Sequence, residues 1–136
     1  MNDDSGASSA SDSVDAAASP DDSGEALAVL AARTADDRKA TDILVLDVGA
    51  VLSITGYFVI ASASNGRLVR NVADEIERAA KEQLGRSPAR VEGLREQQWT
   101  LIDYGDVVVH VFVDEMREFY EIERLYGDVP RIAWQR

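Results

Sequence analysis

Apolar residues recur at helical spacing in two stretches of the chain. The first covers residues 25–39, where an apolar side is followed by a run of charged residues. The second covers residues 64–84 and repeats apolar positions every three or four residues: Val69, Val72, Ala73, Ile76, Ala79, Ala80 and Leu84. Gly85 and Pro88 follow it, and both residue types are common where a helix ends. We therefore predict two amphipathic helices over these ranges.

Shorter apolar runs without a helical period predict strands. Residues 43–47 and 57–62 are rich in Ile, Leu, Val and Phe, which is typical of buried strands. The link between them leaves room for a short extra pairing around residues 51–54. A further short strand is predicted over residues 89–92, directly before Gly93.

Residues 99–112 predict a β-hairpin with a two-residue turn at Tyr104-Gly105, because glycine supplies the positive φ that such a turn demands. With that turn, Asp103 faces Asp106 and Trp99 faces His110 across the strands. Alternation places mostly aliphatic side chains on one side, which we expect to face the core. The other side is mixed and carries Trp99, Leu101, Asp103, Asp106, Val108, His110 and Phe112.

A last helix is predicted from Glu115 to Tyr126, with Asp114 as its N-cap. The resulting order of helices and strands predicts an α/β fold, in which helices pack on a mixed sheet of about five strands. We place this domain over residues 25–128 and a C-terminal extension over residues 129–136.

Charge separates an acidic tail from the rest of the chain. The 136 residues carry a formal net charge of −11, and residues 1–26 contribute seven acidic residues without a single Lys or Arg. Residues 1–24 have almost no large apolar side chain, so we predict that they form a disordered acidic tail. A solubilising extension is favoured over an interaction tail as its role.

The remaining chain is only mildly acidic, which argues against a protein that wraps nucleic acid through its own surface, because phosphate contacts need clustered Lys and Arg. We therefore expect no direct sequence-specific nucleic-acid binding. A basic protein partner is compatible with this charge. No cysteine is present, which excludes thiolate metal sites. The sequence has neither an apolar run long enough to cross a bilayer nor a signal-peptide pattern. We therefore expect a cytoplasmic protein without membrane association.

The carboxylates and the single histidine of the hairpin also suggest an enzyme. The alternative hypothesis is a nucleotidyltransferase-like enzyme that uses Asp103, Asp106 and His110. A turn separates the two carboxylates, whereas a two-metal site on a strand usually places them two residues apart. Glycine-rich phosphate loops and the G-x-S-x-G motif are absent from the sequence. We therefore predict no catalytic residue, metal or cofactor, and favour a docking surface.

Two further alternatives stay open at this point. The paired carboxylates cap turn amides, or pair with Arg117 or Arg95, or await a basic residue of a partner. The whole domain is alternatively a general interaction module that acts through dimerisation.

The segment Trp99-x-x-x-Asp103-Tyr104-Gly105-Asp106-x-x-x-His110 resembles the central signature of the ribosomal silencing factor family, also called RsfS or Iojap. Residues 42–48, 58–74 and 117–126 agree with further family segments in the same order. The resemblance spans roughly residues 27–128. The sequence departs from the family at Gly56, where an Asp is common, and at Tyr126, where a Trp is usual.

This resemblance implies a nucleotidyltransferase-like fold that has lost its catalytic motif. It implies binding to the large ribosomal subunit through ribosomal protein L-fourteen, which blocks joining of the small subunit and represses translation under nutrient limitation. It further implies a role in large-subunit biogenesis, and homodimers for some members. On this basis the predicted partner-binding residues are Trp99, Asp103, Tyr104, Asp106, His110, Arg117 and Tyr120.

Overall fold

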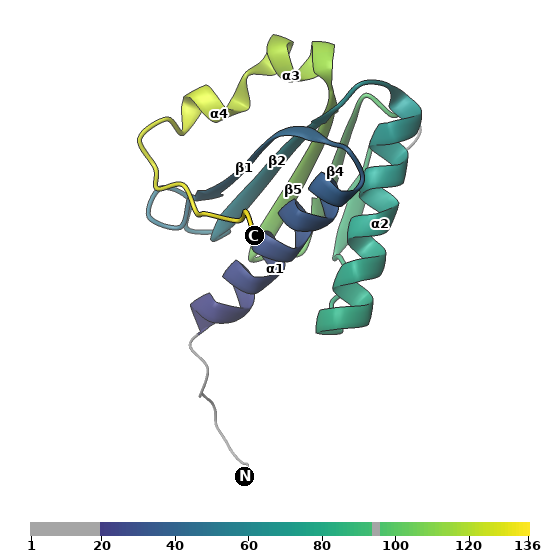
Figure 1. Cartoon of the computed structure of the whole chain (residues 1–136). Helices are drawn as coiled ribbons and strands as arrows, with labels where there is room; N and C mark the ends of the chain where they lie inside the picture. Colours follow the sequence, from purple (N-terminus) through teal and green to yellow (C-terminus); the bar gives the residue numbers. More distant parts are fainter. Residues whose placement is uncertain (1–19, 94–95) are drawn as a thin grey trace.

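A computed structural model describes residues 20–93 and 96–136 of the chain (Figure 1). Its centre is a five-stranded sheet with the order β1-β2-β5-β4-β3. The strands are β1 (Thr41–Asp47), β2 (Tyr57–Ala63), β3 (Arg90–Glu92), β4 (Trp99–Asp103) and β5 (Val107–Val113). β2 and β5 run parallel, and the other neighbouring strands run antiparallel. The mixed sheet predicted from the sequence is confirmed.

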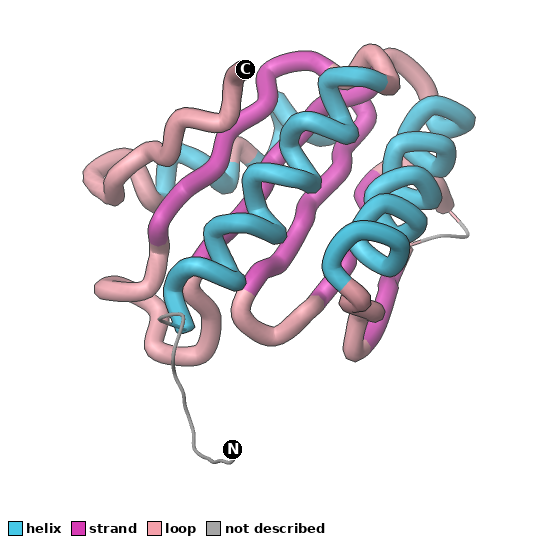
Figure 2. Tube along the Cα trace, turned by 60° about the horizontal axis from the view of Figure 1, so that its bottom comes forward, coloured by secondary structure: helices cyan, strands magenta, loops and turns pink. Residues whose placement is uncertain are grey.

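Helices α1 (Pro20–Asp37) and α2 (Gly66–Leu84) lie side by side on one face of the sheet (Figure 2). The predicted stripe of α2 is buried at Val69, Val72, Ala73, Ile76 and Ala80. Asn65 caps the helix by accepting a hydrogen bond from the Leu68 amide at 2.9 Å. Gly85 ends it in the left-handed conformation that was expected there.

Helix α1 begins five residues earlier than the sequence pattern indicated. Its N-terminal part includes Gly24, which is buried against Tyr57; a Cβ atom there would lie 3.2 Å from the tyrosine ring. The lack of a large side chain, which made this stretch look like part of the tail, is what lets the helix approach β2. The rest of the predicted tail, residues 1–19, lies outside the described residues.

The hairpin turn lies one residue later than predicted, which moves the pairing register of the two strands by two residues. The Tyr104 amide donates to the Val107 carbonyl at 2.9 Å, so Gly105 and Asp106 form the centre of the turn. Trp99 therefore pairs with Phe112, and the predicted Trp99–His110 and Asp103–Asp106 pairs are wrong. Gly105 has a φ of 91°, and it adopts this conformation one position earlier in the turn than predicted. Because the shift is two residues, the strand side chains keep their predicted faces.

Two short helices, α3 (Asp114–Tyr120) and α4 (Ile122–Leu125), replace the single predicted closing helix. The helix is interrupted at Glu121, whose φ is 48°. Ile122 then packs against the apolar cluster on the face of the sheet opposite α1 and α2. Asp114 is the first helical residue and not the N-cap; Val113 takes that position without a side-chain hydrogen bond. The predicted extra pairing over residues 51–54 is also wrong, because Val51 and Leu52 donate to the Val48 carbonyl in a turn.

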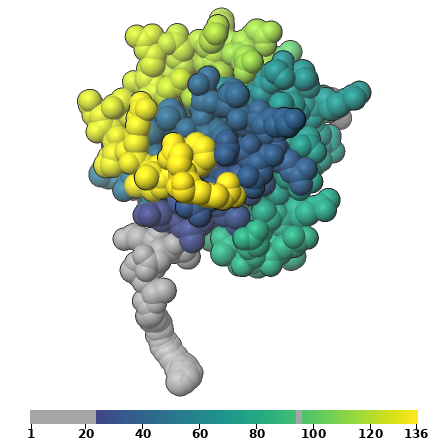
Figure 3. Space-filling view, viewed as in Figure 1, coloured from purple at the N-terminus to yellow at the C-terminus, as the bar shows by residue number. Residues whose placement is uncertain are grey.

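The C-terminal residues run along the outer edge of β1. The Asp47 amide donates to the Pro130 carbonyl at 2.9 Å, and the Ile132 amide donates to the Val45 carbonyl at 2.8 Å. The indole of Trp134 donates to the Ile43 carbonyl at 3.2 Å. Figure 3 shows this segment in yellow against the blue surface of the N-terminal half. The segment thus covers the edge of the sheet, where free backbone groups would otherwise be exposed.

Candidate functional site

The face of the sheet opposite α1 and α2, called the open face below, carries most of the predicted partner-binding residues. The register of the strands arranges its side chains in three rows. Read from β1 towards β3, the rows are Leu46–Phe58–Val108–Asp103–Arg90, Leu44–Ile60–His110–Leu101–Glu92 and Ser62–Phe112–Trp99. Helices α3 and α4 pack against the first strands of this face, through Met116 and Ile122. His110 and Phe112 of β5 are buried on this face. The residues of β4 and β3, together with Val108 of β5, keep exposed surface and are therefore the part that is left for a partner.

Trp99 lies at the border between the covered and uncovered parts of the open face. Its Nε1–H donates to Nδ1 of His110 at 3.2 Å. Its ring stacks on Phe112, with 4.8 Å between centroids, and lies 4.9 Å from the ring of Tyr120. The indole is half-buried, so it supports the aromatic cluster and also reaches the surface. Tyr120 and the adjacent Phe119 are exposed, at 46% and 73%.

His110 is buried beneath this cluster and is only 6% exposed. Desolvation lowers its pKa from 6.5 to about 4, so the ring is neutral near pH 7. Because the Trp99 N–H occupies Nδ1, the neutral ring must carry its proton on Nε2. Within the described residues, Nε2 has no hydrogen-bond partner. A pKa of about 4 is poorly matched to acid–base catalysis at neutral pH.

Asp103 holds the hairpin turn and forms an ion pair. One carboxylate oxygen accepts a hydrogen bond from the Gly105 amide at 2.8 Å, and the other lies 3.4 Å from Nε of Arg90. The interpretation of this carboxylate as a turn cap is therefore confirmed. Its basic partner is Arg90 on β3, whereas Arg117 pairs elsewhere and Arg95 lies outside the described residues.

Asp106 and Tyr104 point to the helix-covered side of the sheet. Asp106 forms an ion pair with Arg86 at 2.6 Å, and its carboxylate lies next to Gly24 of α1. Tyr104 is buried on the same side, with Arg86 5.9 Å from the centre of its ring. Desolvation, with a smaller contribution from Glu77, raises the pKa of Tyr104 to about 12. The structure therefore does not bring Asp103, Asp106 and His110 together as the enzyme hypothesis requires.

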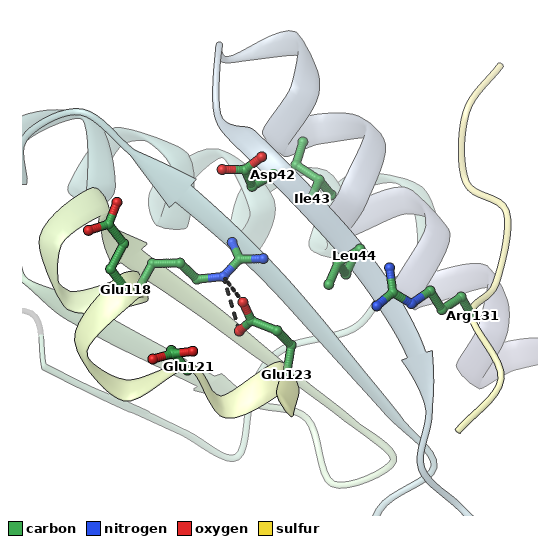
Figure 4. Close-up of a pocket in the computed structure, with 8 residues that line it drawn as sticks. Asp42, Ile43, Leu44, Glu118, Glu121, Glu123 and Arg131 are labelled. Carbon is green, nitrogen blue, oxygen red and sulfur yellow. Dashed lines mark hydrogen bonds and ion pairs between the residues drawn. The ribbon is translucent and has the colours of Figure 1, made fainter. Parts of the chain in front are cut away.

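Arg117 lies on the inner side of α3, and its side chain connects this helix to β2 and α4. Its NH1 group donates to Oγ of Ser62 at 2.7 Å, and its Nε lies 3.2 Å from both carboxylate oxygens of Glu123. The side chain lines a hollow of about 780 Å³ beside β1. Figure 4 shows Glu118, Glu121 and Glu123 on one side of β1 and Arg131 on the other. Arg117 thus fixes α3 and α4 to β2 and is itself nearly buried.

Several exposed apolar residues extend the open face beyond the predicted set. Val51 and Ile54 in the β1–β2 loop are 60% and 85% exposed, and Phe119 is exposed on α3. Isolated apolar residues in a loop form no periodic pattern, so no signal in the sequence singles out Val51 or Ile54 as part of a binding surface. Phe119 stands beside Tyr120 in the closing-helix segment, and that adjacency was an available signal.

Two searches of the described residues bear on other classes of function. In residues 20–93 and 96–136, His, Asp and Glu side chains do not form a group of three or more that is arranged to hold a metal ion. None of the helices in those ranges is long and apolar enough to span a membrane.

Comparisons with known proteins give consistent matches. Residues 20–136 match the family model described as "Ribosomal silencing factor during starvation". Ribosomal silencing factor RsfS of Bacillus subtilis (strain 168) is 41% identical over 101 residues, covering 74% of this chain and 85% of the relative. The Mus musculus protein named mitochondrial assembly of ribosomal large subunit protein 1 is 33% identical over 89 residues, covering 64% of this chain and 39% of that protein. A crystal structure of a Chromobacterium violaceum protein matches with a TM-score of 0.73 and 33% identity, covering 76% of this chain and 85% of that one.

Proposed function

The chain belongs to the ribosomal silencing factor family, and we propose that its open face binds the large ribosomal subunit through ribosomal protein L-fourteen. The bound domain then stands between the subunits and prevents the small subunit from joining, which represses translation under nutrient limitation. This role is steric and needs no catalytic residue. The proposal includes action in the cytoplasm and a second role in large-subunit biogenesis, which the name of the mouse relative supports.

The aromatic cluster around Trp99 carries this proposal. Trp99, Tyr120 and Phe119 are neighbours, with ring centroids about 5 Å apart along the series. Large aromatic side chains that are partly buried and held in one orientation are the residues that most often dominate binding energy at protein interfaces. Stacking on Phe112 and the hydrogen bond to His110 hold Trp99 in such an orientation.

The charge of the domain supports a protein partner over RNA. Residues 27–136 contain 18 acidic and 14 basic residues. Most Arg residues in the described part of the chain form ion pairs with carboxylates. A basic ribosomal protein attracts such a surface, whereas the surrounding RNA phosphates repel it. Binding would therefore concentrate at an exposed protein patch of the large subunit.

Cosedimentation with isolated large subunits tests the proposed binding site. We expect the wild-type protein to move with the subunits, and Trp99→Ala, Tyr120→Ser and Phe119→Ser to reduce this by about tenfold or more, because each removes part of the aromatic cluster. The matched control is Leu84→Ser, which removes an exposed apolar side chain from the end of α2.

Circular dichroism and thermal melts check that each variant is folded. The two exposed positions matter most here, because Trp99→Ala also removes packing on Phe112. Full binding by folded Tyr120→Ser and Phe119→Ser variants would contradict the assigned site. No cosedimentation of the wild-type protein would contradict the function itself.

A further inference from the structure

A groove crosses the uncovered part of the open face next to the Trp99 cluster. Its volume is about 380 Å³, and its walls come from the β1–β2 loop on one side and from β4 and β5 on the other. The apolar side chains that line it are Leu52, Ile54, Phe58, Leu101 and Val108. Arg90 and Asp103 stand at its edge and pair with each other, so the groove presents no unbalanced charge. These properties suit an uncharged, largely apolar occupant.

Two buried polar atoms without a hydrogen-bond partner belong to residues that line this groove. They are Nε2 of His110 and Oγ1 of Thr55, whose residues are 6% and 9% exposed. Among the described residues only Thr100 and Tyr104 hold other such atoms, and both are on the helix-covered side of the sheet. Buried polar groups are nearly always paired in folded proteins, so two unpaired groups around one groove indicate a missing partner.

The hydrogen-bonding character of the two atoms defines the chemistry of that partner. His110 accepts from Trp99 at Nδ1, so its Nε2–H is a donor and requires an acceptor oxygen. The hydroxyl of Thr55 both donates and accepts. An amide group meets both needs, since its carbonyl oxygen accepts from Nε2–H and its N–H donates to the Thr55 hydroxyl. A carboxylate or phosphate is disfavoured, because the neutral imidazole provides no charge to balance it.

We propose that the groove binds a peptide segment of the partner, with an apolar side chain between Phe58, Leu101 and Val108 and an amide carbonyl on His110 Nε2–H. The inference rests on the proposed function in that L-fourteen supplies the segment. Continuity supports this assignment, because the hydrogen bond between Trp99 and His110 joins the groove directly to the aromatic cluster.

Entry of the segment requires the groove to widen. Both unpaired atoms are shielded from water in the present conformation. The β1–β2 loop is the wall with the least packing, because Ile54 and Val51 at its tip are largely exposed. Movement of this loop therefore accompanies binding, and Ile54 closes on the bound side chain.

A pair of matched threonine variants tests the groove. Thr55→Val removes the unpaired hydroxyl and keeps the shape of the side chain, so the free protein keeps or raises its melting temperature. Its affinity for purified L-fourteen, measured by calorimetry, should fall about fivefold, because one hydrogen bond of the complex is lost. Thr100→Val makes the same change at an unpaired buried hydroxyl on the helix-covered side, and should leave the affinity unchanged. A merely structural role of Thr55 predicts no loss of affinity.

Nuclear magnetic resonance of the His110 ring gives the second readout. In protein labelled with ¹⁵N at histidine, the Nε2 resonance should shift when L-fourteen is added. The groove inference would be overturned if the wild-type protein binds L-fourteen, its Nε2 resonance does not move, and Thr55→Val binds with full affinity. The proposed function would then still stand.

A small amide separates the two ideas if wild-type protein fails to bind L-fourteen. The compound is N-acetyl-leucine N-methylamide at millimolar concentration, which offers one apolar side chain and amide carbonyls. In the wild-type protein, the resonances of His110 Nε2 and of the Leu101 and Val108 methyl groups should shift, and in Thr55→Val these shifts should be smaller. This result would support binding in the groove even though the proposed function had failed. No shift in the wild-type protein would overturn the groove as well.

Discussion

At the scale of single residues, Trp99 and His110 fix each other's orientation. The indole N–H occupies one imidazole nitrogen, and the rings of Phe112 and Phe58 enclose the pair. This arrangement explains why the only histidine of the chain is neutral and buried. The hydrogen bond between the two side chains therefore fixes the orientation of Trp99, the proposed docking residue, and leaves the proton of the neutral imidazole on Nε2.

The lowered pKa of His110 predicts acid sensitivity. The folded protein holds His110 neutral down to about pH 4, whereas the unfolded chain protonates it near pH 6.5. The free energy of unfolding is therefore unaffected by His110 above pH 6.5, and it decreases as the pH falls from 6.5 towards 4, because only the unfolded chain gains the proton. Between pH 7 and pH 5 the wild-type protein should lose about 2 kcal/mol more of its free energy of unfolding than His110→Gln does. Urea unfolding at both values measures this difference, and equal losses would contradict a neutral buried His110.

Gly93 and Gly85 should differ in how well they tolerate substitution by alanine. Both have a positive φ, but a Cβ atom on Gly93 would lie 1.9 Å from the Trp99 carbonyl oxygen, whereas one on Gly85 would meet nothing within 4 Å. Gly93→Ala must move the backbone at the start of β4 and should cost about 3 kcal/mol or more. Gly85→Ala carries only the left-handed penalty of about 1 kcal/mol. Chemical denaturation compares the two, and similar costs would contradict the close approach at Gly93.

At the scale of elements, the features that could be predicted are those set by the spacing of apolar residues along the chain. The apolar stripe of α2 and the two faces of β4 and β5 are both confirmed. Ile102, Val109 and Val111 belong to the main core, whereas Trp99 and Phe112 belong to the cluster on the open face. The turn position was wrong because Gly105 fits either of two registers that differ by two residues. The break at Glu121 carries no Gly or Pro signal; it depends on the packing of Ile122. Helix α1 was started too late, because small residues at its N-terminus resemble a tail.

The candidate site was only partly predictable for the same reason. Trp99 and His110 were grouped correctly because they lie on one face of neighbouring strands, and a shift of two residues preserves faces. Asp106 and Tyr104 lie in or beside the turn, where alternation no longer decides direction, and they turn to the helix side. Thr55 lies in a loop without any periodic pattern, and only the three-dimensional structure brings it to the groove.

The C-terminal segment is an element whose removal has a predictable cost. Trp134 packs against the core, its indole donates to Ile43, and its carbonyl accepts from Nε of Arg33 at 2.7 Å. Trp134→Ala should lower the free energy of unfolding by about 3 kcal/mol, whereas Trp134→Phe keeps most of the packing and should cost about 1 kcal/mol. Urea unfolding gives both values. In Trp134→Ala the Asp47 amide, which donates to Pro130, should also exchange faster with deuterium. Unchanged exchange and stability would contradict the role of this segment as a cover for β1.

At the scale of the whole molecule, the two faces of the sheet have different tasks. Helices α1 and α2 cover one face and form the main core with it. The smaller helices cover only part of the other, and leave an aromatic cluster beside an apolar groove. In the proposed function, a domain of this kind occupies a surface of the large ribosomal subunit and excludes the small subunit by its volume alone. The net negative charge opposes binding to ribosomal RNA and so favours one protein contact.

Subunit joining in a purified system tests the central claim most directly. Large subunits are incubated with the protein, small subunits are added, and joined ribosomes are separated from free subunits on a density gradient. We predict that the wild-type protein stays with free large subunits and lowers the fraction of joined ribosomes, whereas folded Tyr120→Ser does neither. Normal joining in the presence of large subunits saturated with wild-type protein would contradict the account.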